Sequence, residues 1–264
     1  MLSELFTYLT TPCPQYVRHM DYLSETIAMR QRYRRNRASW QPHLESSRRF
    51  VLGAAGRCTH RSKAVILGAG LLLDVPLADL SEMFREVVLL DIVLLPEVRR
   101  MIKKYGNVKF IRNDVTNMAE KLYNNVRRGL RELPGATPGI PDLVEHASLV
   151  VSLNILSQLW VVPRAYVLRK LPTVIDEEQL EDWCRQIVES HYAFLQSLTC
   201  PVCLVADHEF VKLDRDGRIV SRGTTVAGFS LPDPQASWTW DIAPMGEDRR
   251  SISKELSVGA WYLR

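Results

Sequence analysis

The sequence contains no long uninterrupted apolar stretch. Although 46% of its 264 residues are hydrophobic, no run approaches the ~18 apolar residues that a membrane-spanning helix requires. The first residues also lack the basic start and the apolar stretch of a secretory signal. These absences exclude a membrane-spanning class, and we expect a cytoplasmic protein with one main globular domain.

Cysteine is scarce and shows no disulfide pattern. The five cysteines are an odd, scattered set, which suits reduced thiols better than a disulfide framework. Cys200 and Cys203 have the CxxC spacing of metal and redox sites, but neither a second CxxC nor an HxxxH pair accompanies them. Because Cys203 falls in a predicted buried strand, we interpret both residues as packing residues and predict no metal site.

Strong net charge is also missing, since the formal charge of +4 at pH 7 is too small to indicate a nucleic-acid partner. One basic segment stands out in a predicted helix from Asp21 to Arg37, where Arg30, Arg34 and Arg37 share a face. This face is either solvated or lines a cleft that binds an anionic substrate through paired guanidinium hydrogen bonds. Aromatic residues are sparse there, which disfavours nucleic acid.

The stretch from Ala64 to Asp91 predicts a strand, a glycine turn, a helix and a second strand. Ala64 to Leu67 is a short apolar run typical of a buried parallel strand, and Gly68 and Gly70 follow it directly. A second apolar run ends on Asp91. A turn that lets backbone approach a ligand, and an acid about 20 residues further on that can bind two ribose hydroxyls, predict a nucleotide-type site.

The rest of the chain repeats the strand and helix pattern and then changes. Polar residues follow three further predicted strands: Asp114 after Val108 to Ile111, Asn154 after Ala147 to Leu153, and Asp207 with His208 after Val202 to Ala206. A hairpin turning at Asp216-Gly217 and two more strands, in SWTWDIAP and VGAWYLR, come last. We therefore predict a doubly wound α/β fold with a mostly parallel seven-stranded sheet, antiparallel C-terminal strands and an N-terminal helical extension.

This order of elements resembles the class I S-adenosylmethionine-dependent methyltransferase family over roughly Phe50 to Arg264. The residues that carry the resemblance are Leu67-Gly68-Ala69-Gly70, Asp91, Asp114 and Ser152-Leu153-Asn154. The resemblance implies a Rossmann-like methyltransferase fold over residues 50–264, with residues 1–49 as a helical extension or lid. It also implies S-adenosyl-L-methionine as the cofactor.

The same resemblance implies roles for the matching residues. Gly68 and Gly70 would approach the methionine part of the cofactor, Asp91 would hold the ribose hydroxyls, and Asp114 would bond the adenine amino group. Asn154 would border the transferred methyl group and is also counted among the cofactor-binding residues.

The glycine turn departs from two patterns. Leu72 stands where a third glycine is common in methyltransferases. A nicotinamide dehydrogenase needs glycine or alanine at the position of Leu73 for close helix–strand packing, so nicotinamide binding is disfavoured.

The predicted methyl transfer requires few catalytic side chains. Methyl transfer from a sulfonium is an in-line displacement, in which the protein mainly orients the nucleophile and excludes water, and a base is needed only for an acceptor with a proton of high pKa. Asn154 and His208 are our candidate catalytic residues, although the His208 ring could simply bond to neighbouring backbone. Gln158, one helical turn after Asn154, joins Arg30, Arg34 and Arg37 as a candidate substrate-binding residue.

Three functions remain open on the sequence. The first is a methyltransferase acting on a small molecule, anionic if the arginine face binds it, with no membrane or nucleic-acid partner and a homodimer as a compatible assembly. The second transfers the aminocarboxypropyl group of the same cofactor. The third is a catalytically silent binding module, with which the leucine-filled turn is compatible and against which the acids Asp91 and Asp114 argue.

Overall fold

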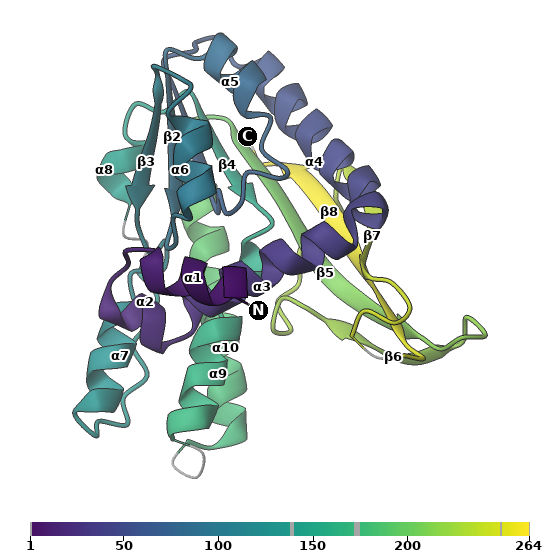
Figure 1. Cartoon of the computed structure of the whole chain (residues 1–264). Helices are drawn as coiled ribbons and strands as arrows, with labels where there is room; N and C mark the ends of the chain where they lie inside the picture. Colours follow the sequence, from purple (N-terminus) through teal and green to yellow (C-terminus); the bar gives the residue numbers. More distant parts are fainter. Residues whose placement is uncertain (1, 138–139, 172–174, 249, 264) are drawn as a thin grey trace.

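One mixed sheet organises the fold (Figure 1). The computed structural model describes residues 2–137, 140–171, 175–248 and 250–263. In this described part the sheet has eight strands with the continuous order β3-β2-β1-β4-β5-β8-β7, and β6 pairs with β5 off this path. The strands are β1 Lys63–Leu67, β2 Glu86–Asp91, β3 Val108–Arg112, β4 Leu149–Leu153, β5 Val202–Leu213, β6 Ile219–Thr224, β7 Ala236–Ala243 and β8 Ser253–Tyr262.

The pairing confirms the predicted doubly wound architecture. Strands β1 to β5 pair in parallel, and β8 pairs antiparallel with both β5 and β7. The continuous order runs through seven strands, as predicted, and β6 is an additional strand beside them.

Strand β5 is longer than the sequence predicts. The expected fifth strand, Val202 to Ala206, and the first arm of the expected hairpin form one strand that continues to Leu213. The pairing of β5 with β8 shifts register between Asp207 and Glu209, and such a bulge bends a strand without ending it. The outer half of β5 then pairs antiparallel with β6, which confirms the predicted hairpin.

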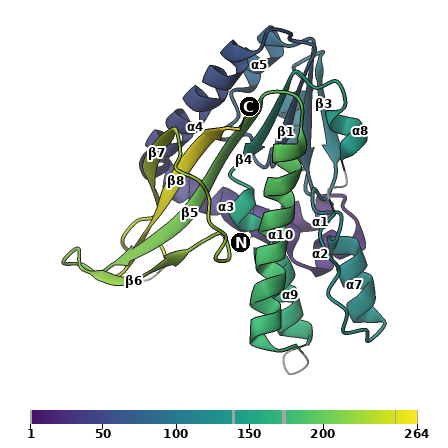
Figure 2. The same ribbon diagram turned by 180° about the vertical axis from the view of Figure 1, so that it is seen from behind.

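Helices cover both faces of the sheet. The helices are α1 Leu2–Thr10, α2 Gln15–His19, α3 Tyr22–Arg35, α4 Arg37–Arg57, α5 Leu77–Met83, α6 Pro96–Ile102, α7 Ala119–Arg127, α8 Pro141–Val144, α9 Val161–Lys170 and α10 Glu177–Ser197, with a 3-10 turn η1 at Leu156–Gln158. Helices α4 to α6 lie on one face (Figure 1), and α7 to α10 lie on the other (Figure 2). Within the described residues, no helix combines the length and the apolar character that a membrane crossing requires.

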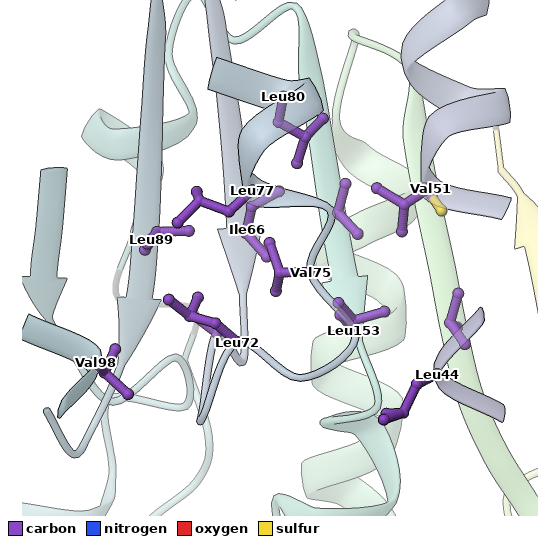
Figure 3. Close-up of a cluster of buried hydrophobic side chains, with 14 of the residues drawn as sticks. Leu44, Val51, Ile66, Leu72, Val75, Leu77, Leu80, Leu89, Val98 and Leu153 are labelled. Carbon is purple, nitrogen blue, oxygen red and sulfur yellow. The ribbon is translucent and has the colours of Figure 1, made fainter. Parts of the chain in front are cut away.

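Each face has its own apolar core because strand side chains alternate. Ile66 and Leu89 pack under α4 and α5 (Figure 3). Val65 and Leu90, one residue away along the same strands, pack under α10. The inner strands are therefore buried on both sides, as their uninterrupted apolar sequences predict.

Helix α4 begins earlier than predicted. We expected Pro42 to mark its start, but the helix begins at Arg37 and Pro42 lies inside it. A proline there removes one backbone hydrogen bond, and packing around it offsets the loss. Trp40 is 1% exposed and donates from Nε1 to the Ile242 carbonyl at 3.1 Å, and Leu44 is 2% exposed.

The helices α1 to α3 lie across the carboxyl ends of the parallel strands (Figure 1). Val17, Met20 and Leu23 are fully buried there, and Met20 packs in the apolar cluster that contains Leu67 and Leu90. The N-terminal segment thus covers the edge of the sheet at which parallel α/β folds bind ligands.

Candidate functional site

The candidate site lies where the strand order reverses. From β1 the chain builds β2 and β3 on one side, and β4 and β5 on the other. Open α/β sheets bind ligands in the crevice at the carboxyl ends of the two strands that flank such a switch point. Gly68 and Gly70 follow β1, and Asn154 follows β4.

The glycine turn requires its glycines. Gly68 has φ +80, and a Cβ atom there would lie 2.8 Å from the Ile155 Cβ and 3.0 Å from the Leu153 carbonyl oxygen. Gly70 has φ +47. Leu72 also takes a left-handed conformation, with φ 60, which explains why glycine would suit this position. Its side chain lies in the apolar cluster beside Val75 (Figure 3), and this packing offsets the backbone strain.

Asp91 ties the end of β2 to the glycine turn. Its Oδ2 accepts a hydrogen bond from the Gly70 amide at 2.8 Å, and its Oδ1 accepts one from the Val93 amide at 3.0 Å. Burial raises the pKa of the Asp91 carboxyl, while the amides of Val93, Gly70 and Ile92 oppose that rise. A carboxylate has about four acceptor positions, so Asp91 keeps capacity for a ligand hydroxyl.

Asp114 organises the loop that leads into α7. Its Oδ1 accepts from the amide and the hydroxyl of Thr116, at 3.0 and 2.6 Å. Its Oδ2 accepts from the amides of Met118 and Ala119, at 3.0 and 2.8 Å. These bonds use the full acceptor capacity of a carboxylate. The Asp114 carboxylate thus caps the free amides at the start of α7. Its contact with the adenine amino group stays a prediction.

Asn154 belongs to a polar cluster that joins four segments of the chain. It has φ 49, its Nδ2 donates to Asp74 Oδ2 at 2.6 Å, and it lies 3.4 Å from His43 Nε2. His43 Nδ1 accepts from the indole Nε1 of Trp238 at 3.0 Å. The His43 ring also stacks on Trp240, with centroids 4.0 Å apart and an interplanar angle of 3°.

These contacts fix the tautomer of His43. The residue is 1% exposed, and burial lowers its pKa to about 3, so the ring is neutral at physiological pH. Since an indole nitrogen can only donate, Nδ1 is the unprotonated nitrogen and Nε2 carries the hydrogen. The Nε2–H group therefore points toward the amide of Asn154 as a donor.

The amide of Asn154 has unused hydrogen-bonding capacity. Among the described residues, its buried Oδ1 has no partner. If the amide is turned by 180°, Oδ1 accepts from His43 and from a protonated Asp74, and Nδ2 becomes the unpaired atom. Burial raises the pKa of Asp74, while the bond from Asn154 and the charge of Arg48 oppose this. Because His43 donates from Nε2, the turned arrangement is the one that fits, and it leaves Nδ2 of Asn154 for a ligand.

The two candidate catalytic residues lie on different faces of the sheet. The His208 ring is edge-on to Trp261, with centroids 6.2 Å apart, and Trp261 packs in the cluster under α10. Asn154 instead contacts His43 of α4. Gln158 is exposed, and its Nε2 donates to Ser157 Oγ at 3.1 Å. The structure therefore does not bring His208 together with Asn154.

The three candidate arginines do not converge either. Arg30 is 8% exposed and donates from Nη1 to Glu97 Oε1 at 2.6 Å, whereas Arg34 and Arg37 are exposed. Burial alone would raise the pKa of Glu97, but the bond from Arg30 lowers it below its ordinary value. The predicted shared face fails because α3 ends at Arg35 and α4 begins at Arg37, so the helical spacing does not extend across all three.

The sheet and its switch-point site define a doubly wound α/β protein, the fold class that the sequence predicts. No protein-family model matches the chain, and no curated protein matches it either.

Solved structures with a similar fold include three methyltransferase structures. The 1,6-didemethyltoxoflavin-N1-methyltransferase of Burkholderia thailandensis is 12% identical, with 95% of this chain and 93% of that chain covered and a TM-score of 0.39. DhpI in its SAM-HEP complex is 13% identical, with 93% and 99% covered and a TM-score of 0.39. A SAM-dependent methyltransferase from Leishmania major is 14% identical, with 97% and 81% covered and a TM-score of 0.33.

Replacing Gly68 by alanine tests the geometry of the turn. We expect Gly68→Ala to lower the free energy of unfolding by about 2–4 kcal/mol, because the new Cβ meets both a left-handed backbone and a collision. Gly129→Ala is the matched control, since Gly129 has φ +72 with no neighbour within 4 Å of its Cβ, and it should cost only ~1 kcal/mol. Urea unfolding measures both, and equal losses would contradict the close approach at Gly68.

The buried His43 predicts a specific pH dependence. Its folded pKa of about 3 lies below the ordinary value of ~6.5, so the unfolded chain binds more protons between these values. Stability that His43 contributes above pH ~6.5 is therefore lost as pH falls toward 3, at up to ~1.4 kcal/mol per pH unit. In His43→Gln this loss disappears, and the difference in unfolding free energy from wild type should change by about 3 kcal/mol between pH 7 and 4.

The control for this experiment is His146→Gln, because His146 is exposed. Comparison of variants with wild type removes the opposite contribution of the buried aspartates. A difference that stays constant over the same pH range in both variants would mean that His43 is not held neutral.

Proposed function

We propose that the chain is an S-adenosyl-L-methionine-dependent methyltransferase acting on a small-molecule acceptor. The observation that carries the proposal is the 2.8 Å bond between the Gly70 amide and the Asp91 carboxylate. It brings a left-handed glycine turn and an acid into contact at the switch point of a doubly wound sheet, where such folds bind nucleotides.

The residues present fit this cofactor. Gly68 and Gly70 carry no side chain where a cofactor would approach, and a Cβ at Gly70 would lie 4.0 Å from Asp91 Oδ2, in ordinary contact. Gly68 and Gly70 would face the methionine part, and Asp91 would accept from the ribose hydroxyls. When bound, the cofactor supplies an electrophilic methyl group on a sulfonium.

The shape of the turn supports this cofactor over a dinucleotide. Dinucleotide sites place the pyrophosphate at the N-terminus of a helix that directly follows the glycine turn. Here α5 begins only at Leu77, and Pro76 at its N-cap has no amide hydrogen to offer. The S-adenosylmethionine molecule has no pyrophosphate and does not need that helix terminus.

The polar cluster around Asn154 would then serve the acceptor. His43, held by Trp238, fixes the orientation of the Asn154 amide by donating from Nε2, and the unpaired end of the amide can bind the acceptor. In this arrangement Oδ1 of Asn154 accepts from His43 and from a protonated Asp74, so the free Nδ2 group is the one that donates to the acceptor. The helices α1 to α3 would exclude water from the strand ends.

The exchange of Asp91 for asparagine tests the cofactor assignment. Asp91→Asn should weaken the binding of S-adenosylhomocysteine by roughly ten- to a hundredfold, because a hydrogen bond to a charged group contributes about 1.5–3 kcal/mol. Titration calorimetry on folded protein measures the affinity. Asp79→Asn is the control, since Asp79 is an exposed acid on α5. Unchanged affinity in Asp91→Asn, or no binding by wild type at about 1 mM, would reject the assignment.

A further inference from the structure

Two lysines face each other directly on the outer part of the sheet. Lys212 of β5 pairs with Lys254 of β8 in the antiparallel register, so their side chains stand on the same face. Like charges directly opposite one another destabilise a sheet. A negatively charged group bound between the two lysines would offset this repulsion.

An aromatic ring gathers the two ammonium groups. The Nζ atoms of Lys254 and Lys212 lie 5.3 and 5.6 Å from the centroid of the Phe210 ring. Phe210 can lie against β6 because Gly223, its paired residue, has no side chain. A Cβ at Gly223 would come within 2.9 Å of the ring. Both charges are thereby held at one place on the sheet.

A cavity lies at this place. It has a volume of about 120 Å³ and is lined by Lys212, Asp248, Ile252, Ser253 and Lys254. This exceeds the ~30 Å³ that one water occupies and leaves room for a group of several heavy atoms. Asp248, the acid in the lining, accepts from Arg32 Nη2 at 2.7 Å, so a guanidinium already balances its charge.

The lowered pKa of Lys254 is consistent with a site that favours an anion. Burial lowers the pKa of Lys254, and the charges of Lys212 and Arg32 lower it further, while Asp207 and Asp248 act in the opposite direction. A bound anion would stabilise both ammonium groups.

We propose that the cavity between Lys212 and Lys254 binds an oxyanion, the phosphate or carboxylate group of a ligand. Charge-assisted hydrogen bonds from ammonium groups to such oxygens are among the strong ones in proteins. The proposed anion site lies on the outer strands β5 and β8, whereas the sequence left open whether Arg30, Arg34 and Arg37 bind an anion or face solvent.

The two lysines lie on the same face of the sheet as Trp238. Asp207 and Trp238 both pair with Val258 of β8, and Val258 packs in the cluster under α4. Phe210 packs against the same cluster, so this sheet face continues from Trp238 to the lysines. Leu256 and Trp240, which are 2% and 8% exposed, fill the face between the two places, so the oxyanion site is separate from the candidate site.

Inorganic phosphate is the probe for the oxyanion site, compared with chloride at equal ionic strength. Phosphate at about ten times its Kd should raise the Tm of the wild-type chain by on the order of 3 °C. Lys254→Met and the double variant with Lys212→Met should lose this rise. Lys109→Met should keep it, because Lys109 is an exposed lysine of β3 that pairs with Glu86.

Equal phosphate responses in wild type and the double variant, or an equal rise in chloride, would overturn the oxyanion site. A separate measurement distinguishes failure of the oxyanion site from failure of the proposed function. The lysine variants should bind S-adenosylhomocysteine as wild type does, whereas absence of that binding in every form rejects the cofactor and leaves the phosphate result standing.

Discussion

The contact between Asp91 and the glycine turn is the constraint on which the site depends. The Gly70 amide reaches the carboxylate only because Gly68 and Gly70 take left-handed conformations, and Gly68 has no room for a side chain beside Leu153 and Ile155. This bond adds to those from the amides of Gly68 and Ala69 to the Leu90 carbonyl, at 3.0 Å each, so several hydrogen bonds link the ends of β1 and β2, and packing against Leu153 links them to β4. These contacts join the ends of three adjacent strands at the switch point.

Much of the fold follows from local sequence. The strands end where apolar runs meet a polar residue, as at Asp91 and Asn154, because a residue buried on both faces must be apolar. The hairpin at Asp216-Gly217 was predictable because a glycine there suits the turn, and Gly217 has φ +77. The full length of β5 was not, since the bulge at His208 depends on pairing with β8, which lies far along the chain.

The site was only partly predictable. Its backbone elements could be placed from the sequence, but the cluster around Asn154 depends on His43, whose contacts come from distant segments. The one local signal is that His43 falls three residues after Trp40 and one before Leu44, on the buried stripe of α4. Nothing in the local sequence shows that Lys212 opposes Lys254, because strand register is set by long-range pairing.

A crystal structure of the chain with S-adenosylhomocysteine tests the central claim most directly. The account predicts that the ribose hydroxyls lie within about 3 Å of the Asp91 carboxylate and that the amino-acid part of the ligand lies against Gly68 and Gly70. Ligand density elsewhere on the chain, or a ribose that does not contact Asp91, would contradict it.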